Sequence, residues 1–315
     1  MEGLFASFTI LWGRIFEGTN FNMTKQVTAL LEALRPREWI KNTFIFAGAV
    51  FGERLLMTEV LATLLAGFIL FSFGASAVYL FNDLRDVEKD KLHPQKANRP
   101  IPSGRLKGGV ALFFAIIIMV TVITLSLHLG KGFGLWVLTY ILVNMLYSVK
   151  LKDVVIIDVM SIAAGFVIRV LAGCSLAGVT PSDWLIICTI TISLFLGFCK
   201  RRQELLLVAS SGKTTRQVLE DYSIRFLDQM IAIVTAATLI SYILYTLAQE
   251  TVAKFGTRKL IFTSVFVLYG IFRYLYIIYQ KGHSGNPTDT FFSDPPFLIN
   301  CLIWGVTVLV IVYGR

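Results

Sequence analysis

Residues 60–90 read VLATLLAGFILFSFGASAVYLFNDLRDVEKD, an apolar run that is followed at once by a dense group of charged residues. The run 60–81 is long enough to cross the hydrocarbon layer of a bilayer as one α-helix, which takes about 20 apolar residues. The polar group begins at Asn82, where the apolar run ends. This stretch predicts a transmembrane helix whose end carries a cluster of carboxylates.

The whole chain has the composition of a membrane protein. Of its 315 residues, 56% are hydrophobic and 16% are charged, whereas soluble domains have about 25% charged residues. A soluble protein with a very large core is the competing interpretation, but long apolar runs between short charged clusters favour lipid as the solvent. We therefore expect an all-α, polytopic membrane bundle of nine transmembrane helices, over residues 42–58, 60–81, 109–129, 132–148, 154–175, 184–199, 228–249, 259–279 and 292–313.

The positions of lysine and arginine predict how this bundle is oriented. With the amino terminus inside, most of the 29 basic residues fall in cytoplasmic segments, which agrees with the positive-inside rule. We expect a multi-pass protein of the plasma (inner) membrane with its site facing the cytoplasm. The basic residues are divided among loops on one side, so the net charge of +9 predicts contacts with membrane lipid or a phosphorylated ligand and no nucleic acid.

Residues 27–315 are expected to form a single transmembrane domain. The preceding segment, residues 1–26, contains only a brief apolar stretch from Leu4 to Trp12. It lacks the basic leader and the small-residue cleavage site of a signal peptide. We expect an interfacial or disordered segment there and assign it no chemistry.

The acidic residues after the second expected span predict a metal site. If the helix continues, Asp83, Asp86 and Asp90 are three and seven residues apart and share one face. Three carboxylates there would repel one another, and a divalent cation with a preference for oxygen ligands, such as Mg²⁺, removes that repulsion. Arg85 and Lys89 lie on a neighbouring face, where they could hold phosphate oxygens. The alternative is a solvated helix end with ordinary charge pairs.

Two nearby segments carry further candidate ligands for an anion. Arg99 lies in a loop, residues 93–105, that contains many turn-forming residues and could fold over a substrate. Lys41 and Asn42 stand at the start of the first expected span, where they could face the same ligand as the aspartates. The alternatives are topology-setting charge for Arg99, and an interfacial arrangement in which Trp39 anchors the helix while Lys41 reaches the headgroups.

Two charged residues lie within the fifth expected span. Asp158 and Arg169 are eleven residues apart and project from nearly the same side of that helix. Charges at membrane depth are costly and face protein or a wet cavity, so both residues are candidates for function. A structural pairing with another helix is the alternative for Arg169.

Polar residues at the inner ends of the fourth and sixth expected spans complete the candidate set. Tyr147 lies at the end of the fourth span and Lys152 shortly after it, and both could border the same site. Lys200 and Arg201 end the sixth span. Cations at that boundary fit phosphate binding and fit a stop-transfer signal equally well.

Together these residues resemble the UbiA superfamily of intramembrane prenyltransferases. The hallmark of that superfamily is an Asn-Asp-x-x-Asp-x-x-x-Asp motif after the second helix, which Asn82, Asp83, Asp86 and Asp90 match in full. Within the superfamily the chain is most similar to the decaprenyl-phosphate phosphoribosyltransferase branch. The similar stretches are Arg35 to Asn42, His93 to Pro100, Tyr147 to Lys152, Lys200-Arg201 with Glu204, and Gly285 to Asp289.

This resemblance implies a nine-helix fold with a central cavity open to the cytoplasm and laterally to lipid. It also implies a reaction that joins a polyprenyl phosphate to phosphoribosyl pyrophosphate and releases pyrophosphate, with Mg²⁺ as the cofactor. The family's second acidic motif usually supplies more than one aspartate. Here Asp158 is the expected counterpart, while Asp153 projects differently, so the chain departs from the family at its second metal site.

The resemblance also implies a role for each candidate residue. Asp83, Asp86 and Asp90 would hold Mg²⁺ on the pyrophosphate, and Asp158 would bind a second ion or the ribose hydroxyls. The lipid phosphate is already anionic, so no general base is needed. The other candidates would position the phosphates or border the site, and they are Lys41, Asn42, Asn82, Arg85, Lys89, Arg99, Tyr147, Lys152, Arg169, Lys200 and Arg201.

Two other functions remain open from the sequence. A conventional superfamily enzyme would use the same aspartates to bind a prenyl diphosphate, with an aromatic ring or another lipid as the acceptor. A transporter could also use charges within the membrane. The acidic residues, however, gather at one membrane boundary and only Arg169 lies deep in a span, which argues against transport.

Overall fold

The computed structural model describes residues 23–93, 96–211, 217–281 and 287–314, which form helices and connecting segments without a strand. Eight helical segments in these ranges are long and apolar enough to cross a membrane. They are α4 (Thr58–Arg85), α6 (Gly108–Leu129), α7 (Lys131–Val149), α8 (Ile157–Ala177), α9 (Asp183–Ser211), α10 (Ile224–Leu247), the segment Lys259–Lys281 with α12 (Ser264–Tyr276) at its centre, and α14 (Pro295–Tyr313). Shorter helices are α2 (Met23–Ala33), α5 (Val87–Lys91), α11 (Gln249–Phe255) and α13 (Pro287–Ser293).

The all-α membrane bundle expected from the sequence is confirmed, and eight of the nine expected spans coincide with these long helices. The first expected span, 42–58, differs. It begins in the 3₁₀ segment η1 (Pro36–Phe46), continues through the short helix α3 (Ala47–Phe51) and ends in turns before α4. A 3₁₀ helix rises about 2.0 Å per residue, so this short segment still extends through much of the bundle.

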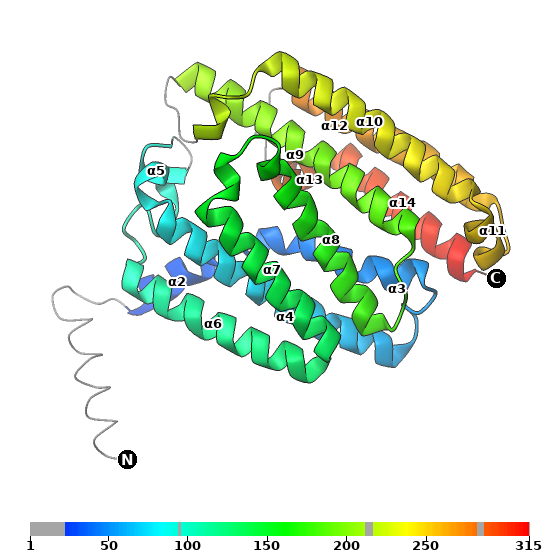
Figure 1. Cartoon of the computed structure of the whole chain (residues 1–315), viewed down its shortest axis with the longest axis horizontal. Coiled ribbons are helices and arrows are strands. Elements are labelled where there is room, and N and C mark those ends of the chain that lie inside the picture. Colours follow the sequence, from blue (N-terminus) through cyan, green and yellow to red (C-terminus); the bar gives the residue numbers. More distant parts are fainter. Residues whose placement is uncertain (1–22, 94–95, 212–216, 282–286, 315) are drawn as a thin grey trace.

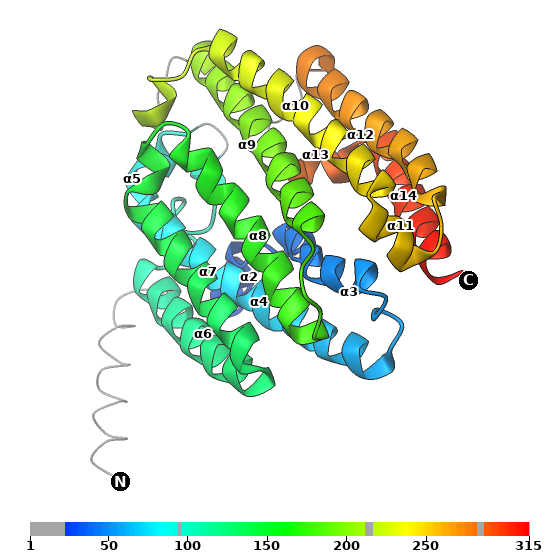
Figure 2. The ribbon, with the colours of Figure 1, turned by 45° about the vertical axis from the view of Figure 1, so that its right-hand side comes forward.

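The helices pack as two groups that meet along α8 and α9, as Figures 1 and 2 show. One core joins η1, α4, α6, α7 and α8 around Phe71, Phe133 and Tyr140. The other joins α8, α9, α10 and α12 around Phe195 and Tyr274. Because α8 contributes to both cores, its side chains can reach both halves of the bundle.

Glycines let η1 and α3 lie directly on α8. A Cβ atom added at Gly173 would stand 1.8 Å from the carbonyl oxygen of Ile45, and one added at Gly48 would stand 2.4 Å from the sulfur of Cys174. Any larger side chain would push the two segments apart. This close approach holds the second half of η1, with Lys41 and Asn42, against α8.

The outer surface of the bundle is apolar. Ile116, Val120, Leu302, Val306 and Val310 are each more than half exposed. An exposed apolar surface of this extent is unfavourable in water and fits contact with lipid tails. The chain is therefore a multi-pass membrane protein.

Parts of the sequence analysis fall on residues that the structure does not describe. The expected amino-terminal segment 1–26 lies outside the described residues except for 23–26, which belong to α2. Pro94, Gly285 and Asn286 also lie outside them. The division into segments 1–26 and 27–315 thus stays a prediction.

Candidate active site

Three aspartates gather where α4 gives way to α5. Asp83 lies in the last turn of α4, Asp86 caps that helix, and Asp90 lies in α5. The backbone N–H of Asp90 donates to the carbonyl of Asp86 at 2.7 Å, so the helical course continues almost unbroken from α4 into α5. The three residues are 1%, 9% and 5% exposed. The three residues share one face, as their spacing predicts, and this face is buried.

Each of these carboxylates contacts a cationic side chain from elsewhere in the chain. The Arg35 guanidinium lies 2.5 Å from both oxygens of Asp83. Arg99 bridges two aspartates, since its Nη1 donates to Asp83 at 3.2 Å and to Asp90 at 2.9 Å. The Lys152 ammonium group donates to Asp86. The aspartates and the bases therefore form one interleaved cluster of charges.

Arg35 was not among the residues expected at the site, although it opens the Arg-Pro stretch before the first span. Its backbone is in the left-handed region, with φ 52° and ψ 61°, directly before Pro36. Such a conformation is strained for a residue with a side chain, and strain of this kind tends to occur at functional sites. Its position before a proline was the available signal. Lys96, which lies 3.9 Å from Asp90, belongs to the same loop as Arg99, where the sequence predicts donors for an anion.

Burial and mutual repulsion act on the carboxylates of the cluster. The pKa of Asp90 is raised above its ordinary value, mainly because the group is buried. Repulsion from Asp83 and Asp86 raises this pKa further, while attraction to Lys96 and Arg99 lowers it. The three carboxylates are thus close enough to destabilise one another's charge, which is the situation that a bound cation relieves.

The donor chemistry of the cluster fits Mg²⁺, which takes a few carboxylates and keeps water and phosphate oxygens as its other ligands. The described residues, however, contain no group of three acidic, histidine or cysteine side chains that converges on one metal position. Asp86 is turned toward Lys152, while Asp83 and Asp90 are joined through Arg99. Direct ligation by all three carboxylates would require these side chains to exchange partners.

Of the residues expected beside the aspartates at the end of α4, one lies near the cluster and two are exposed. Asn82 lies near the cluster and accepts a hydrogen bond from the Ser148 hydroxyl at 3.0 Å. Arg85 is exposed and donates to the carbonyl of Val149 at 3.1 Å. Lys89 is also exposed. Arg85 and Lys89 are therefore not brought together with the three aspartates.

A second buried cluster forms around Asp158, on the side of α8 that faces α9. Asp158 and Arg201 are both 0% exposed, and the Arg201 Nε donates to the Asp158 carboxylate. The Tyr222 hydroxyl donates to the other Asp158 oxygen at 2.7 Å. Arg201 also donates to Glu204 and, at 3.0 Å, to the Tyr147 hydroxyl. Both carboxylate oxygens of Asp158 and all three guanidinium nitrogens of Arg201 thus form hydrogen bonds with other side chains.

The third set of expected residues surrounds Arg169 in the middle of α8. Its Nε donates to the Asn42 side-chain oxygen at 2.8 Å, and one terminal nitrogen donates to the Tyr140 hydroxyl at 2.9 Å. Lys41 forms an ion pair with Glu38 at 2.5 Å. Asn42 is 1% exposed and Arg169 is 5% exposed. Lys200, the remaining candidate, is half-buried at the inner part of α9, one residue before Arg201.

Comparison with protein families gives one match over most of the chain. The model of the UbiA prenyltransferase family matches residues 43–302. A decaprenyl-phosphate phosphoribosyltransferase of Corynebacterium glutamicum is 32% identical over 295 residues, which cover 90% of this chain and 86% of that protein. The protein of the same name from Mycobacterium tuberculosis is 29% identical and is matched over 90% of this chain and 93% of its own length.

A solved structure with the same arrangement of helices comes from Archaeoglobus fulgidus. It is a UbiA homologue with GPP and Mg²⁺ bound, and it superposes with a TM-score of 0.70 over 90% of this chain and 99% of its own. The sequence identity is 17%. At this identity the likeness concerns the fold.

Proposed function

Because the chain belongs to the UbiA prenyltransferase family, we propose that it is a Mg²⁺-dependent membrane phosphoribosyltransferase. In the proposed reaction, a 5-phosphoribosyl group passes from phosphoribosyl pyrophosphate to a polyprenyl phosphate, and pyrophosphate is released. The names of the relatives from Corynebacterium glutamicum and Mycobacterium tuberculosis support this choice of substrates.

The observation that carries the proposal is the interleaving of carboxylates and bases at the end of α4. A site for two phosphorylated substrates needs metal-binding oxygens and cationic donors side by side. Asp83 is in contact with both Arg35 and Arg99, and Asp86 is in contact with Lys152. Each acidic group is thus adjacent to a base that can bind a phosphate once the acid binds a metal.

The chemistry requires charge stabilisation and alignment more than proton transfer. When the bond from ribose C1 to the pyrophosphate oxygen breaks, negative charge develops on the pyrophosphate. Mg²⁺, when bound, would neutralise part of that charge. Asp83, Asp86 and Asp90 would hold the metal, while Arg99 and Lys152 would bind phosphate oxygens in a largely water-free site.

The acceptor needs no general base in this reaction. A polyprenyl phosphate carries a negative oxygen at neutral pH, and this oxygen forms the new bond to ribose C1. The work of the protein is to hold that oxygen in line with the leaving group. The proposal therefore does not require a catalytic histidine or an activated serine at the site.

We place this site on the cytoplasmic side of the plasma membrane. The aspartate cluster belongs to the set of segments that, with the amino terminus inside, together carry most of the basic residues of the chain, which favours a cytoplasmic position. A phosphorylated sugar donor from the cytoplasm would then reach the carboxylates directly. The lipid acceptor would enter from within the bilayer.

A direct test supplies the purified protein, in lipid nanodiscs, with two substrate pairs. The first is phosphoribosyl pyrophosphate with a polyprenyl phosphate, and the second is a prenyl diphosphate with an aromatic or lipid acceptor. We expect Mg²⁺-dependent product from the first pair only. Product from the second pair alone would show a conventional prenyltransferase. In a separate measurement on protein reconstituted into sealed vesicles, uptake of an unchanged solute would show a transporter.

A further inference from the structure

Arg169 carries a buried positive charge in the membrane-spanning part of α8. Its hydrogen-bond acceptors, Asn42 and Tyr140, are neutral. Its guanidinium carbon lies 4.7 Å from the Tyr140 ring centre, 5.1 Å from that of Phe166 and 5.6 Å from that of Phe71. In the part of the chain that the structure describes, no carboxylate pairs with this guanidinium. A buried charge without a counter-charge is unfavourable unless an anion joins it.

A second cation adds to this positive charge. The Lys41 ammonium group is close enough to Arg169 for the two charges to repel each other. The carboxylate that pairs with Lys41 is Glu38, which also accepts a hydrogen bond from the Thr288 hydroxyl at 3.1 Å. Lys41 thus shares its carboxylate with a hydroxyl, and Glu38 makes no ion pair with Arg169 among the described residues. The group formed by Lys41, Asn42, Tyr140 and Arg169, called the Arg169 site below, has an excess of positive charge.

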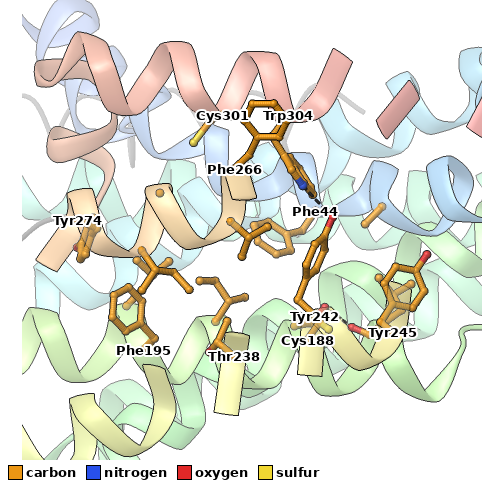
Figure 3. A pocket seen from close by; sticks show the side chains of 18 of the residues that line it. Phe44, Cys188, Phe195, Thr238, Tyr242, Tyr245, Phe266, Tyr274, Cys301 and Trp304 are labelled. Carbon is orange, nitrogen blue, oxygen red and sulfur yellow. Dashed lines mark hydrogen bonds between the residues drawn. The ribbon is translucent and has the colours of Figure 1, made fainter. Parts of the chain in front are cut away.

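An apolar cavity of about 360 Å³ lies between η1, α3, α9, α10, α12 and α14. Aromatic side chains make up much of its wall, and Figure 3 shows Phe195 and Tyr274 at one end and Tyr245 at the other. Near that second end, the Trp304 indole donates to the Tyr242 hydroxyl at 2.9 Å. A cavity of this lining, inside a membrane protein, fits a hydrocarbon chain and would be poorly hydrated.

Two aromatic contacts connect this cavity with the Arg169 site. Phe44 lines the cavity and is two residues beyond Asn42 in η1. Its ring lies 5.0 Å from the ring of Phe166, in an edge-on contact, and Phe166 in turn lies against Arg169. The rings of Phe44 and Phe166 thus lie between Arg169 and the cavity, and the first carbons of a lipid with its anionic head at Arg169 would have to pass these two rings.

Tyr79 places the Arg169 site next to the aspartate cluster. Tyr79 lies on α4, one helical turn before Asp83, and the Arg35 guanidinium lies 5.0 Å from its ring centre. Tyr79 also interacts electrostatically with Lys41. Two cationic sites thus flank one tyrosine. One of them contains carboxylates for a metal and the other does not.

We infer that the Arg169 site binds the phosphate of a single-chain isoprenoid monophosphate, and that the cavity beyond Phe44 receives the first part of its chain. This inference rests on the proposed function and adds that the two substrates bind through their phosphates at separate sites. The acceptor phosphate occupies Lys41 and Arg169, whereas the donor pyrophosphate occupies the aspartate cluster. A chamber of about 360 Å³ favours a lipid with one chain over a two-chain phospholipid.

The test measures binding of farnesyl phosphate to the full-length protein in detergent, without any sugar donor. Farnesol serves as the neutral ligand of equal chain, and dilauroyl phosphatidic acid as the two-chain phosphate. We expect farnesyl phosphate to bind tightest. Arg169→Gln should weaken it at least tenfold, the effect of losing a charge-assisted hydrogen bond, while farnesol binding stays at the wild-type level. Arg169→Lys should recover part of the loss.

A matched pair on α9 tests the cavity. Cys188 lines the cavity, whereas its neighbour Ile187 is 41% exposed on the outer surface. We expect Cys188→Trp to fill the cavity and to weaken the binding of both farnesyl phosphate and farnesol. Ile187→Trp should change neither. If Arg169→Gln does not fold, Lys41→Gln takes its place with the same expected loss of farnesyl phosphate.

Several results would overturn the inference. One is wild-type affinity for farnesyl phosphate in both Arg169→Gln and Lys41→Gln. Another is an affinity for dilauroyl phosphatidic acid equal to that for farnesyl phosphate. A third is unchanged binding of farnesyl phosphate and farnesol in Cys188→Trp. The proposed function fails separately. Ligand binding that follows the expected pattern without phosphoribosyl transfer would support the lipid site and contradict the proposed function. Phosphoribosyl transfer with an unchanged KM for the lipid in Arg169→Gln would support the proposed function and contradict the lipid site.

Discussion

The Arg35 guanidinium lies 2.5 Å from both carboxylate oxygens of Asp83, although the two residues are 48 positions apart in the chain. The contact joins the start of η1 to the last turn of α4. It also requires the left-handed backbone at Arg35, with φ 52°. A strained residue is thus held against the first aspartate of the cluster, where it can orient this carboxylate or bind a phosphate.

Replacing Arg35 should lower activity much more than replacing its exposed neighbour. We expect Arg35→Ala to reduce kcat/KM by about 100-fold, the effect of losing one preorganised charged donor. Arg35→Lys should recover part of the activity, because a single nitrogen, Nη2, contacts both oxygens of Asp83 and an ammonium group can take the same place. Arg37→Ala is the matched control, since Arg37 is exposed. Steady-state kinetics on the three variants would decide, and equal rates for Arg35→Ala and Arg37→Ala would exclude a role for the contact.

Loss of Asp158 should affect stability. The Asp158→Ala variant leaves the fully buried Arg201 without one of its carboxylates. Removing one partner of a buried ion pair costs up to about 3–5 kcal/mol, and the ion pair that Arg201 keeps with Glu204 reduces this loss. Unfolding in detergent should therefore show a large loss for Asp158→Ala.

The exposed pair between Arg105 and Glu32 provides the comparison for Asp158. These side chains are each 48% exposed and lie 2.5 Å apart. Exposed ion pairs contribute about 0–1 kcal/mol, so Arg105→Ala should change the free energy of unfolding little. Equal losses for Asp158→Ala and Arg105→Ala would contradict the structural role of the Asp158 cluster.

The sequence allowed the helices and the aspartate face to be predicted for clear physical reasons. Apolar runs of sufficient length specify membrane spans, and the spacing of Asp83, Asp86 and Asp90 specifies one helix face. Both depend only on local geometry. The partners of these aspartates depend on how distant segments fold, and so Arg35, which reaches Asp83 through a strained turn, was not assigned to the site.

Long-range packing also decides which charges are available to a ligand. Asp158 and Arg169 lie on one helix and project from nearly the same side, yet they contact different helices. Asp158 is held by Arg201 and Tyr222, while Arg169 is held by neutral groups on η1 and α7. The spacing of charges along one helix could not distinguish these surroundings.

The stability of the carboxyl-terminal helix should depend on pH through Asp294. This residue caps α14 and accepts hydrogen bonds from Arg273 and from the backbone N–H of Phe297. The ion pair with Arg273 lowers the pKa of Asp294 to about 2. A carboxylate with a lowered pKa stabilises the folded state above about pH 4, its unfolded range, and this contribution is lost as the pH falls toward 2.

The Asp294→Asn variant separates the charge from the cap. Asparagine caps a helix about as well as aspartate, so the difference in unfolding free energy between the two proteins should reflect the ion pair. We expect this difference to be largest at pH 5 and to disappear near pH 2. A difference that stays constant from pH 5 to pH 2 would show that the charge of Asp294 does not stabilise the fold.

The close approach of η1 to α8 should not tolerate a methyl group. Alanine favours a helix over glycine by about 1 kcal/mol, but a Cβ at Gly173 would stand 1.8 Å from the Ile45 carbonyl oxygen. We expect Gly173→Ala to destabilise the protein by about 1–3 kcal/mol, the range for overpacked sites. Gly305→Ala is the control, since open space surrounds that position. Thermal unfolding should rank Gly173→Ala well below Gly305→Ala, and the reverse order would contradict the described packing.

The central claim is that the carboxylates at the end of α4 support transfer of a phosphoribosyl group to a lipid phosphate. The most direct measurement follows label from the ribose of phosphoribosyl pyrophosphate into the lipid extract, with purified wild-type protein and the Asp83→Asn variant. We predict Mg²⁺-dependent labelling of polyprenyl phosphate by the wild type and a loss of at least about 100-fold in the variant, with both proteins folded. Equal labelling by the two proteins, or no dependence on Mg²⁺, would contradict the account.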